Sequence, residues 1–466
     1  MSRSLIAAVL AASTALSACT LAPPYEQPQL AVSSAWPDGL AAAEAGQSAA
    51  ALDWREVYLD PKLQAVIALA LEENRDLRVA VLNIEKARSQ YRVQRSALVP
   101  AVDAGVSGSR GRTPGDLSGT GSAIETESYS ASLGVTAYEL DLFGRVRSLN
   151  EAALQSYLAT AETRRAVQVS LIAETATAYL TLAADQDLLS LARDTLKSRE
   201  DALRLTRSRN EAGAASLLEV RQAETLTEQA RADVGAFGAQ VAQDRNALRL
   251  LVGAEVSTDL MPASLDSIAI RSDLPAGLPS EVLRARPDVL AAEHRLIGMN
   301  ANIGAARAAY FPRINLTGNL GSASADLSGL FGGNSGTWSF APSISLPIFD
   351  GGARDANLKG AKTDRQIAVA EYDRTVQVAF REVSDALAVK SSIDGRLGAL
   401  TRLLVAATDG ELLSRSRYDQ GVDSYLVLLD AQRTRYSAEQ ALISIKLTQA
   451  GNLATLYKAL GGGSPG

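Results

Sequence analysis

The sequence predicts a mixed fold of long α-helices and short β-strands, arranged as two internal repeats. Two observations support this prediction. A glycine-centred segment around Gly421 has a weaker copy around Gly213 (421 − 213 = 208), and the same offset relates Gly461 to Gly253. Apolar residues also alternate with small or polar residues in four short stretches, two in each half, which lie between stretches of helical periodicity. Each half is therefore predicted to contain a helix, two strands, a long helix and a shorter helix.

Composition limits the kinds of partner. The chain has 466 residues, 46 of them basic and 52 acidic, and its net charge of −6 gives no indication of a nucleic-acid partner. Apolar residues make up 47 % of the chain but aromatic residues only 5 %. This composition favours long helices packed side by side over a thick globular core.

The N-terminus indicates export. Arg3 precedes the apolar run Leu5 to Leu16, which is shorter than the ~20 residues of a spanning helix, and Leu16-Ser17-Ala18-Cys19 follows. This pattern resembles a bacterial lipoprotein signal, with residues 1–18 as the signal peptide and Cys19 as the lipidated first residue, carrying diacylglycerol and palmitate. The alternatives are an ordinary signal peptide and a retained anchor. Cys19 is the only cysteine, so it forms no internal disulfide.

The first repeat is predicted over residues 61–253. Residues 19–60 are rich in Pro, Ala, Ser and Gly and predict an extended tail, which Trp54 could dock. A helix should then run from Pro61 to about Leu98, where Pro100 ends it. Beyond it we expect strands at about 101–109 and 127–137, a long helix from about Val146 to Asn210, and a shorter helix from Gly213 to Leu251. At ~1.5 Å per residue the long helix would measure ~90 Å.

The second repeat is predicted over residues 281–461, after a linker at 254–280 and before a tail at 462–466. A helix from Glu281 to Ala309 ends before Pro312. The remaining elements are expected in the same order as in the first repeat: strands at about 313–322 and 337–348, a long helix to about Gln420, and a final helix after Gly421.

The four predicted strands are close to the ~9–11 residues that cross a bilayer at a tilt. Alternation alone allows either lipid or a soluble core on the apolar face, but the lipoprotein signal and the long helices favour lipid. About eight strands are the smallest number known to close a membrane barrel, and an open strand edge is not tolerated in hydrocarbon. If the strands span a membrane, the chain must therefore oligomerise: two copies would supply eight strands and three would supply twelve.

Several motifs together resemble the TolC family of outer-membrane efflux proteins, specifically its lipoprotein (NodT- or OprM-like) branch. They include the segments Ser128–Ser148, Ala301–Gly318, Leu346–Gly352, Tyr418–Arg433 and Tyr457–Gly463. The resemblance implies a homotrimer with a shared 12-stranded transmembrane β-barrel, continued by a long periplasmic α-helical barrel. It also implies a bacterial outer-membrane exit channel for drugs and other toxic small molecules. The implied partners are a periplasmic membrane-fusion adaptor, an inner-membrane RND transporter and outer-membrane lipid.

The same resemblance implies a periplasmic gate. By matching position its residues are Tyr418, Glu219 and Asp430, and three copies of each acid around an axis would favour cations. Asp423 is included, although some family members carry an arginine there and a second aspartate in place of Val427. The alternative is that Asp430 and Glu219 are ordinary solvated helix residues.

The hairpin glycines Gly213 and Gly421 are expected to mark the adaptor contact. Thr20, which follows Cys19 in place of an aspartate, fits sorting to the outer membrane.

No motif for catalysis or metal binding is found. His294 is the only histidine, no second histidine or cysteine is available as a metal ligand, and no phosphate-binding loop occurs. We therefore expect no enzyme activity, cofactor or metal apart from the lipid. Other readings are a conduit for protein secretion, a structural lipoprotein tethering the envelope, and heavy-metal export. For metal export, the three methionines (Met1, Met261 and Met299) offer no visible relay.

Overall fold

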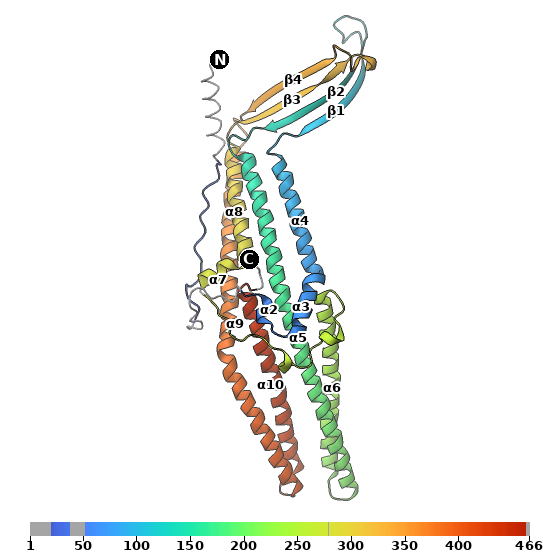
Figure 1. The fold of residues 1–466 in the computed structure, drawn as a ribbon, viewed down its shortest axis with the longest axis vertical. Coiled ribbons are helices and arrows are strands. Elements are labelled where there is room, and N and C mark those ends of the chain that lie inside the picture. Colours follow the sequence, from blue (N-terminus) through green and yellow to red (C-terminus); the bar gives the residue numbers. More distant parts are fainter. Residues whose placement is uncertain (1–19, 38–51, 278, 463–466) are drawn as a thin grey trace. The chain divides into compact units, whose positions relative to one another are not determined.

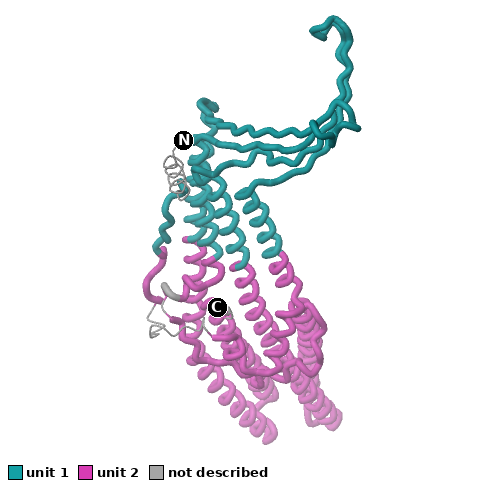
Figure 2. Tube along the Cα trace, turned by 45° about the horizontal axis from the view of Figure 1, so that its top comes forward, with its two compact units in different colours: residues 1–29, 83–161, 291–372 teal, residues 30–82, 162–290, 373–466 magenta. Residues whose placement is uncertain are grey.

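The structure is a computed structural model that describes residues 20–37, 52–277 and 279–462 (Figure 1). Cys19 and the predicted signal peptide lie outside the described residues. The chain forms two compact units (Figure 2). Unit 1 consists of residues 1–29, 83–161 and 291–372, and unit 2 of residues 30–82, 162–290 and 373–466. The units do not coincide with the sequence repeats, because elements of both repeats pack together within each unit.

Unit 1 contains one antiparallel sheet in the order β1-β2-β3-β4. Its strands are β1 (Val102–Thr113), β2 (Ile124–Glu139), β3 (Arg313–Ser324) and β4 (Gly336–Ser345). The first three strands extend past the predicted ends, whereas β4 ends three residues before its predicted end at 348. The strand ends two residues before Pro347; the other proline, Pro342, lies inside β4, where an edge strand tolerates it.

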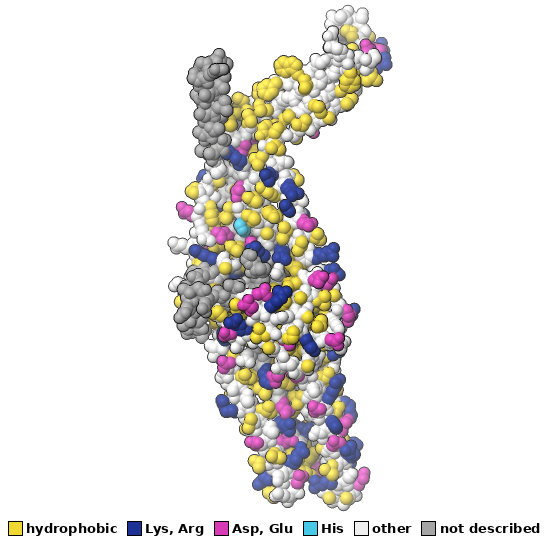
Figure 3. Space-filling view, in the orientation of Figure 1, with side chains coloured by type: hydrophobic (Ala, Val, Ile, Leu, Met, Phe, Trp, Pro, Cys, Tyr) yellow, Lys and Arg dark blue, Asp and Glu magenta, His cyan; other side chains and the backbone are white. Residues whose placement is uncertain are grey.

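One face of this sheet is apolar. Leu133 of β2 lies opposite both Ala104 of β1 and Leu320 of β3, and Leu320 lies opposite Trp338 of β4. Leu133, Leu320 and Trp338 are 58 %, 69 % and 77 % exposed. The visible face of the sheet carries mostly hydrophobic and uncharged side chains, and charged ones gather near the β1–β2 loop (Figure 3). The single chain therefore leaves this apolar face without a core to cover it.

Two long helices run through both units: α5 (Arg145–Glu211) and α9 (Ala353–Asp419). Each is followed by a shorter helix in unit 2, α6 (Leu217–Val252) or α10 (Tyr425–Ala459). Helix α5 contains a window of 18 residues that is apolar enough to cross a membrane by length and composition, and 56 % of that window is buried inside the structure. Core helices of soluble proteins pass the same test, so the window is weak evidence for a membrane-spanning helix.

The prediction of one continuous helix before each strand pair was wrong. The first is divided at Asn74 into α3 (Pro61–Glu73) and α4 (Arg75–Ser96), and the second at Arg286 into α7 (Pro279–Ala285) and α8 (Pro287–Ala308). Pro287 disfavours the helical conformation of the residue before it. Asn74 is extended and caps the next helix, because its Oδ1 accepts a hydrogen bond from the Leu77 N–H at 2.7 Å.

The two break residues make equivalent contacts within unit 2. Asn74 Nδ2 donates to the Leu251 carbonyl at 2.6 Å, and Arg286 Nη1 donates to the Ala459 carbonyl at 2.7 Å. Leu251 and Ala459 are 208 residues apart and lie at the ends of α6 and α10. Each break therefore supplies a partner for a carbonyl that the end of a helix leaves unpaired.

A glycine follows each of these helix ends. Gly253 has φ +81°, and a Cβ on it would lie 2.5 Å from the Glu73 carbonyl oxygen. Gly461 has φ +79° and a Cβ on it would contact Arg286. Both the left-handed backbone and the close approach require glycine at these positions.

The N-terminal segment is extended but docked. In unit 1, Arg307 and Asn300 donate to the carbonyls of Leu21 and Pro23, and Tyr25 donates to Glu293 at 2.9 Å. In unit 2, the Trp36 ring stacks on Phe380 at a centroid distance of 5.1 Å, and its Nε1–H donates to the Gly277 carbonyl. The remaining short elements of unit 2 are α2 (Trp54–Val57), η3 (Thr258–Leu260) and η4 (Leu265–Ser267), and Trp54 is buried. A last short element, η5 (Leu327–Gly329), belongs to unit 1.

Candidate functional site

The two helical hairpins of unit 2 have the same turn. Gly213 (φ +75°) joins α5 to α6, and Gly421 (φ +73°) joins α9 to α10. In each turn the residue after the glycine donates its N–H to an arginine carbonyl: Ala214 to Arg209 at 2.7 Å, and Val422 to Arg417 at 2.9 Å. A left-handed glycine with such a bond is a helix-ending motif, which explains why the glycine recurs in the sequence.

The hairpins of the two repeats pack against each other through an apolar cluster. Its buried members come from α5, α6 and α10: Leu203, Val220, Ala223, Leu226, Tyr425, Leu428 and Leu429. Tyr418, at the end of α9, is partly buried and packs against this cluster. The cluster holds Tyr418 close to residues of the first repeat that are about 200 positions earlier in the sequence.

Tyr418 links the hairpins by polar contacts. Its hydroxyl donates to Glu219 Oε2 at 3.4 Å and accepts from Arg209 Nη1 at 3.2 Å. The Arg209 guanidinium also lies 5.2 Å from the centre of the Tyr418 ring, within range of a cation–π interaction. Burial raises the pKa of Tyr418, so the phenol remains a neutral hydrogen-bond donor. The structure therefore brings together two of the predicted gate residues, Tyr418 and Glu219.

Arg209 was missed as a site residue, although the sequence contains a signal for it. It belongs to an Arg-Ser-Arg triplet that recurs 208 residues later, where Arg417 is its counterpart. Arg417 forms a two-armed ion pair with Asp423 in its own turn, at 2.6 and 2.9 Å, and this contact lowers the pKa of Asp423. The counterpart of Asp423 in the first repeat is Ala215. Arg209 therefore has no carboxylate at the position equivalent to Asp423, and it donates to Tyr418 of the second hairpin.

Asp423 and Asp430 lie apart from the Tyr418 contact. Asp423 is held by Arg417, as described above. Asp430 is exposed on α10, and its backbone carbonyl accepts from Thr434. Among the described residues, no hydrogen-bond partner is found for the Asp430 carboxylate, which is therefore available to a neighbouring molecule or to ions.

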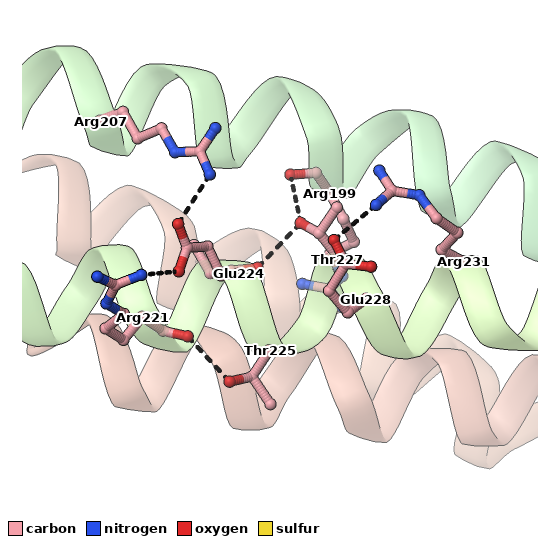
Figure 4. A network of polar contacts seen from close by, with 9 residues as sticks. Arg199, Arg207, Arg221, Glu224, Thr225, Thr227, Glu228 and Arg231 are labelled. Atoms are coloured by element: carbon pink, nitrogen blue, oxygen red, sulfur yellow. Dashed lines mark hydrogen bonds and ion pairs between the residues drawn. The ribbon is translucent and has the colours of Figure 1, made fainter.

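Charged side chains lie along and between α5 and α6 of the first hairpin (Figure 4). Glu224 accepts from both Arg207 and Arg221 at 2.7 Å, and these bonds lower its pKa. Arg231 donates to Glu228 of α6 and Glu200 of α5. The pairs Arg207–Glu224 and Arg231–Glu200 join α5 to α6, whereas Arg221–Glu224 and Arg231–Glu228 lie within α6. All four are exposed, so they contribute little to stability.

The family model for the outer membrane efflux protein matches residues 66–254 and 278–462. The chain belongs to the outer membrane efflux protein family. The matched segments coincide closely with the two repeats and omit most of the linker between them.

Named relatives and solved structures agree with this membership. The chain is 49 % identical to the toluene efflux pump outer membrane protein TtgC of Pseudomonas putida, with 96 % of this chain and 93 % of that protein covered. It is 45 % identical to the outer membrane protein OprJ of Pseudomonas aeruginosa, with 98 % and 95 % covered. The crystal structure of the open state of the MtrE outer membrane channel of Neisseria gonorrhoeae superposes with a TM-score of 0.88 at 44 % identity, covering 96 % of this chain and 98 % of that chain.

Family membership confirms several predictions made from the sequence. The mixed α and membrane β fold class, the efflux function and the outer-membrane location are those of this family. Its members are efflux proteins of the channel type. The single histidine, His294, has a partner within unit 1, because its Nδ1 lies 2.7 Å from Gln155 Oε1. In the described part of the chain, no group of three or more His, Cys, Asp or Glu side chains could hold a metal ion.

Proposed function

We propose that three copies of this efflux protein share one 12-stranded β-barrel and form a passive exit channel through the outer membrane. One observation carries the proposal: the four-stranded sheet has two unpaired edges, β1 and β4, and an exposed apolar face. An open edge is unfavourable in lipid, and four strands are too few to close a barrel. Three copies supply the twelve strands, and the apolar face then contacts lipid.

The channel conducts small apolar toxic molecules, and its partners are a periplasmic membrane-fusion adaptor and an inner-membrane RND transporter. The names of the relatives support the substrate class, because TtgC is named for toluene efflux and another relative, SrpC of Pseudomonas putida, for solvent efflux. The chain itself performs no catalysis and binds no cofactor. Cys19 carries the lipid, which adds a second membrane attachment to the barrel.

Tyr418, Glu219 and Arg209 close the channel at the hairpin ends of the helices. The Tyr418 contact joins the hairpins of the two repeats, so an opening that separates the hairpins breaks it. Asp430 and Glu219 supply carboxylates around the axis and favour cations. Gly213 and Gly421 form the turns that the adaptor contacts.

Two measurements test this function. Purified protein in detergent should have the mass of three chains and should conduct ions in a planar lipid bilayer. Deletion of the gene should lower the concentration of toluene and of antibiotics that stops growth, and the wild-type gene should restore it. A stable monomer without conductance, or unchanged susceptibility after deletion, would contradict the proposal.

A further inference from the structure

A cavity of about 500 Å³ lies between the helices of unit 2. Its wall comes from both repeats, because α5 and α6 of the first repeat and α9 and α10 of the second all contribute side chains to it. Binding sites for drug-sized molecules commonly have volumes of ~300–1,000 Å³. The cavity is therefore large enough for a small organic molecule, and every copy of the chain supplies its own.

The wall of this cavity is largely apolar. Three helices contribute alanine side chains to it: Ala173, Ala178, Ala247 and Ala459. The threonines of the wall use their hydroxyl hydrogens within their own helices, since Thr177 donates to the Ala173 carbonyl at 2.8 Å, Thr181 to Thr177 at 2.9 Å and Thr455 to Gly451 at 3.0 Å. Contact with apolar surface is therefore the main attraction that most of the wall offers to a ligand.

Four charged side chains also line the cavity, and one of them lacks an opposite charge. Glu174 pairs with Lys458 at 3.4 Å, and Glu382 pairs with Arg286 at 2.8 Å. Asp244 of α6 forms no ion pair with any residue in the described part of the chain. The negative charge that remains in the cavity is therefore located at Asp244.

The Asp244 carboxylate also has an unused acceptor atom. Its Oδ1 accepts from Gln240 Nε2 at 3.0 Å, whereas its Oδ2 is buried and has no hydrogen-bond partner among the residues that the structure describes. The neighbouring Asp185 carboxyl can donate to Asp244 only while it holds a proton, and burial raises the pKa of Asp185 to about 7. A buried acceptor without a donor is unfavourable, so an N–H group of a bound molecule would stabilise it.

We propose that this cavity is a binding site for amphiphilic organic cations. A protonated amine of the ligand donates to Asp244, and its apolar ring or chain packs against the alanines of the wall. An inorganic cation would leave the apolar wall unfilled, and no group of three or more metal-ligating side chains occurs among the described residues. The inference rests on the proposed channel, because it assigns a place of binding to molecules that pass along these helices.

Two compounds of the same shape test the charge requirement. Naphthylmethylammonium and naphthylmethanol share one ring system, but only the first carries a positive charge. Equilibrium dialysis against the full-length protein in lipid nanodiscs, with empty nanodiscs as the blank, should show tighter binding of the cation. Asp244→Asn keeps the size of the side chain and should weaken binding of the cation about tenfold, because a hydrogen bond to a charged group is lost, while binding of the alcohol stays unchanged.

Matched variants on the same helix separate this site from general effects of charge and size. Asp233 of α6 accepts a hydrogen bond from Tyr436 and does not line the cavity, so Asp233→Asn should leave binding of the cation unchanged. Ala247→Leu fills the cavity and should weaken binding of both compounds several-fold. Ala242→Leu, at an equally exposed position of α6 outside the cavity, should affect neither compound.

The outcomes separate this inference from the proposed function. Equal affinity for the cation and the alcohol, or an Asp244→Asn protein that binds the cation as tightly as the wild type, would overturn the site and leave a conducting trimer in place. An equal loss of binding in Asp233→Asn would also overturn it, because the attraction would then not be specific to the cavity. Absence of trimers and of conductance would instead contradict the proposed channel itself.

Discussion

Replacing Arg286 with alanine should destabilise the protein more than any other single change at the helix breaks. The Arg286 side chain is 8 % exposed and donates to the Ala459 carbonyl at 2.7 Å. It also forms ion pairs with Asp288 and Glu382, both at 2.8 Å. Removing one partner of a buried ion pair costs ~3–5 kcal/mol. The two carboxylates are 37 % and 38 % exposed, so water compensates part of the loss and we expect ~3 kcal/mol.

The first repeat provides a matched comparison. Asn74→Ala removes a cap to Leu77 and a hydrogen bond to Leu251, each worth ~1 kcal/mol, so the expected loss is ~2 kcal/mol. Arg271→Ala, which removes only an exposed ion pair with Asp273, should leave the stability of the fold nearly unchanged.

The rate of heat inactivation ranks the three variants by their loss of stability. Proteins of this kind commonly unfold irreversibly, so the rate of loss of trimer at a fixed temperature is the appropriate quantity. The rate should rise most for Arg286→Ala, less for Asn74→Ala and least for Arg271→Ala. An Arg286→Ala protein that survives as long as Arg271→Ala would refute the assignment of Arg286 as the partner of the α10 carboxyl end.

The remaining predictions concern a carboxyl pair, a glycine and the anchor. Burial and a hydrogen bond with Asp244 raise the pKa of Asp185 from 3.8 to about 7, so the folded protein retains a proton that the unfolded chain releases. Stability should therefore fall as pH rises from ~4 to ~7, and Asp185→Asn should remove that dependence in thermal scans. Gly253→Ala should destabilise the folded protein by over ~1 kcal/mol, whereas Gly235→Ala should not, because no atom lies within 4 Å of a Cβ built on Gly235. Rates of denaturation of the two variants would show the difference. A Cys19→Ser variant exported by an ordinary signal peptide should still insert in the outer membrane, but less efficiently. If cell fractionation recovered this variant only as a soluble protein, the membrane barrel would be contradicted.

Much of the fold follows from local rules that the sequence obeys twice. The glycine after each hairpin helix, the proline before each strand pair and the alternation of the four strands are local signals. Repetition at a nearly constant offset strengthens each of them. The break at Asn74 was missed because asparagine has no strong breaking effect by itself. Only its alignment with Arg286-Pro287 marks it, and the reason for the break, the carbonyl of Leu251, is 177 residues away.

The candidate site was predicted less completely, because its contacts join the two repeats. Tyr418 and Glu219 were selected by resemblance, and their hydrogen bond depends on how the hairpins pack. Arg209 donates to Tyr418, whereas its counterpart Arg417 pairs with Asp423 of its own turn. The sequence shows that Ala215 replaces this aspartate in the first repeat, but it does not show that Tyr418 lies beside Arg209. Among the described residues the Asp430 carboxylate has no such contact, so the role proposed for it depends on the other copies.

Single-channel recording tests the central claim most directly. Wild-type trimers in a planar bilayer should show a small, cation-preferring conductance, because in the proposed gate the Tyr418 contacts close the hairpin end and the carboxylates of Glu219 and Asp430 favour cations. Each polar contact contributes only ~1 kcal/mol, but threefold repetition makes its removal shift a closed-to-open balance of a few kcal/mol. Tyr418→Phe with Asp430→Ala should therefore raise the conductance and weaken the cation preference. Trimers that pass no ions, or a double variant with unaltered conductance and selectivity, would contradict a channel closed at the hairpins.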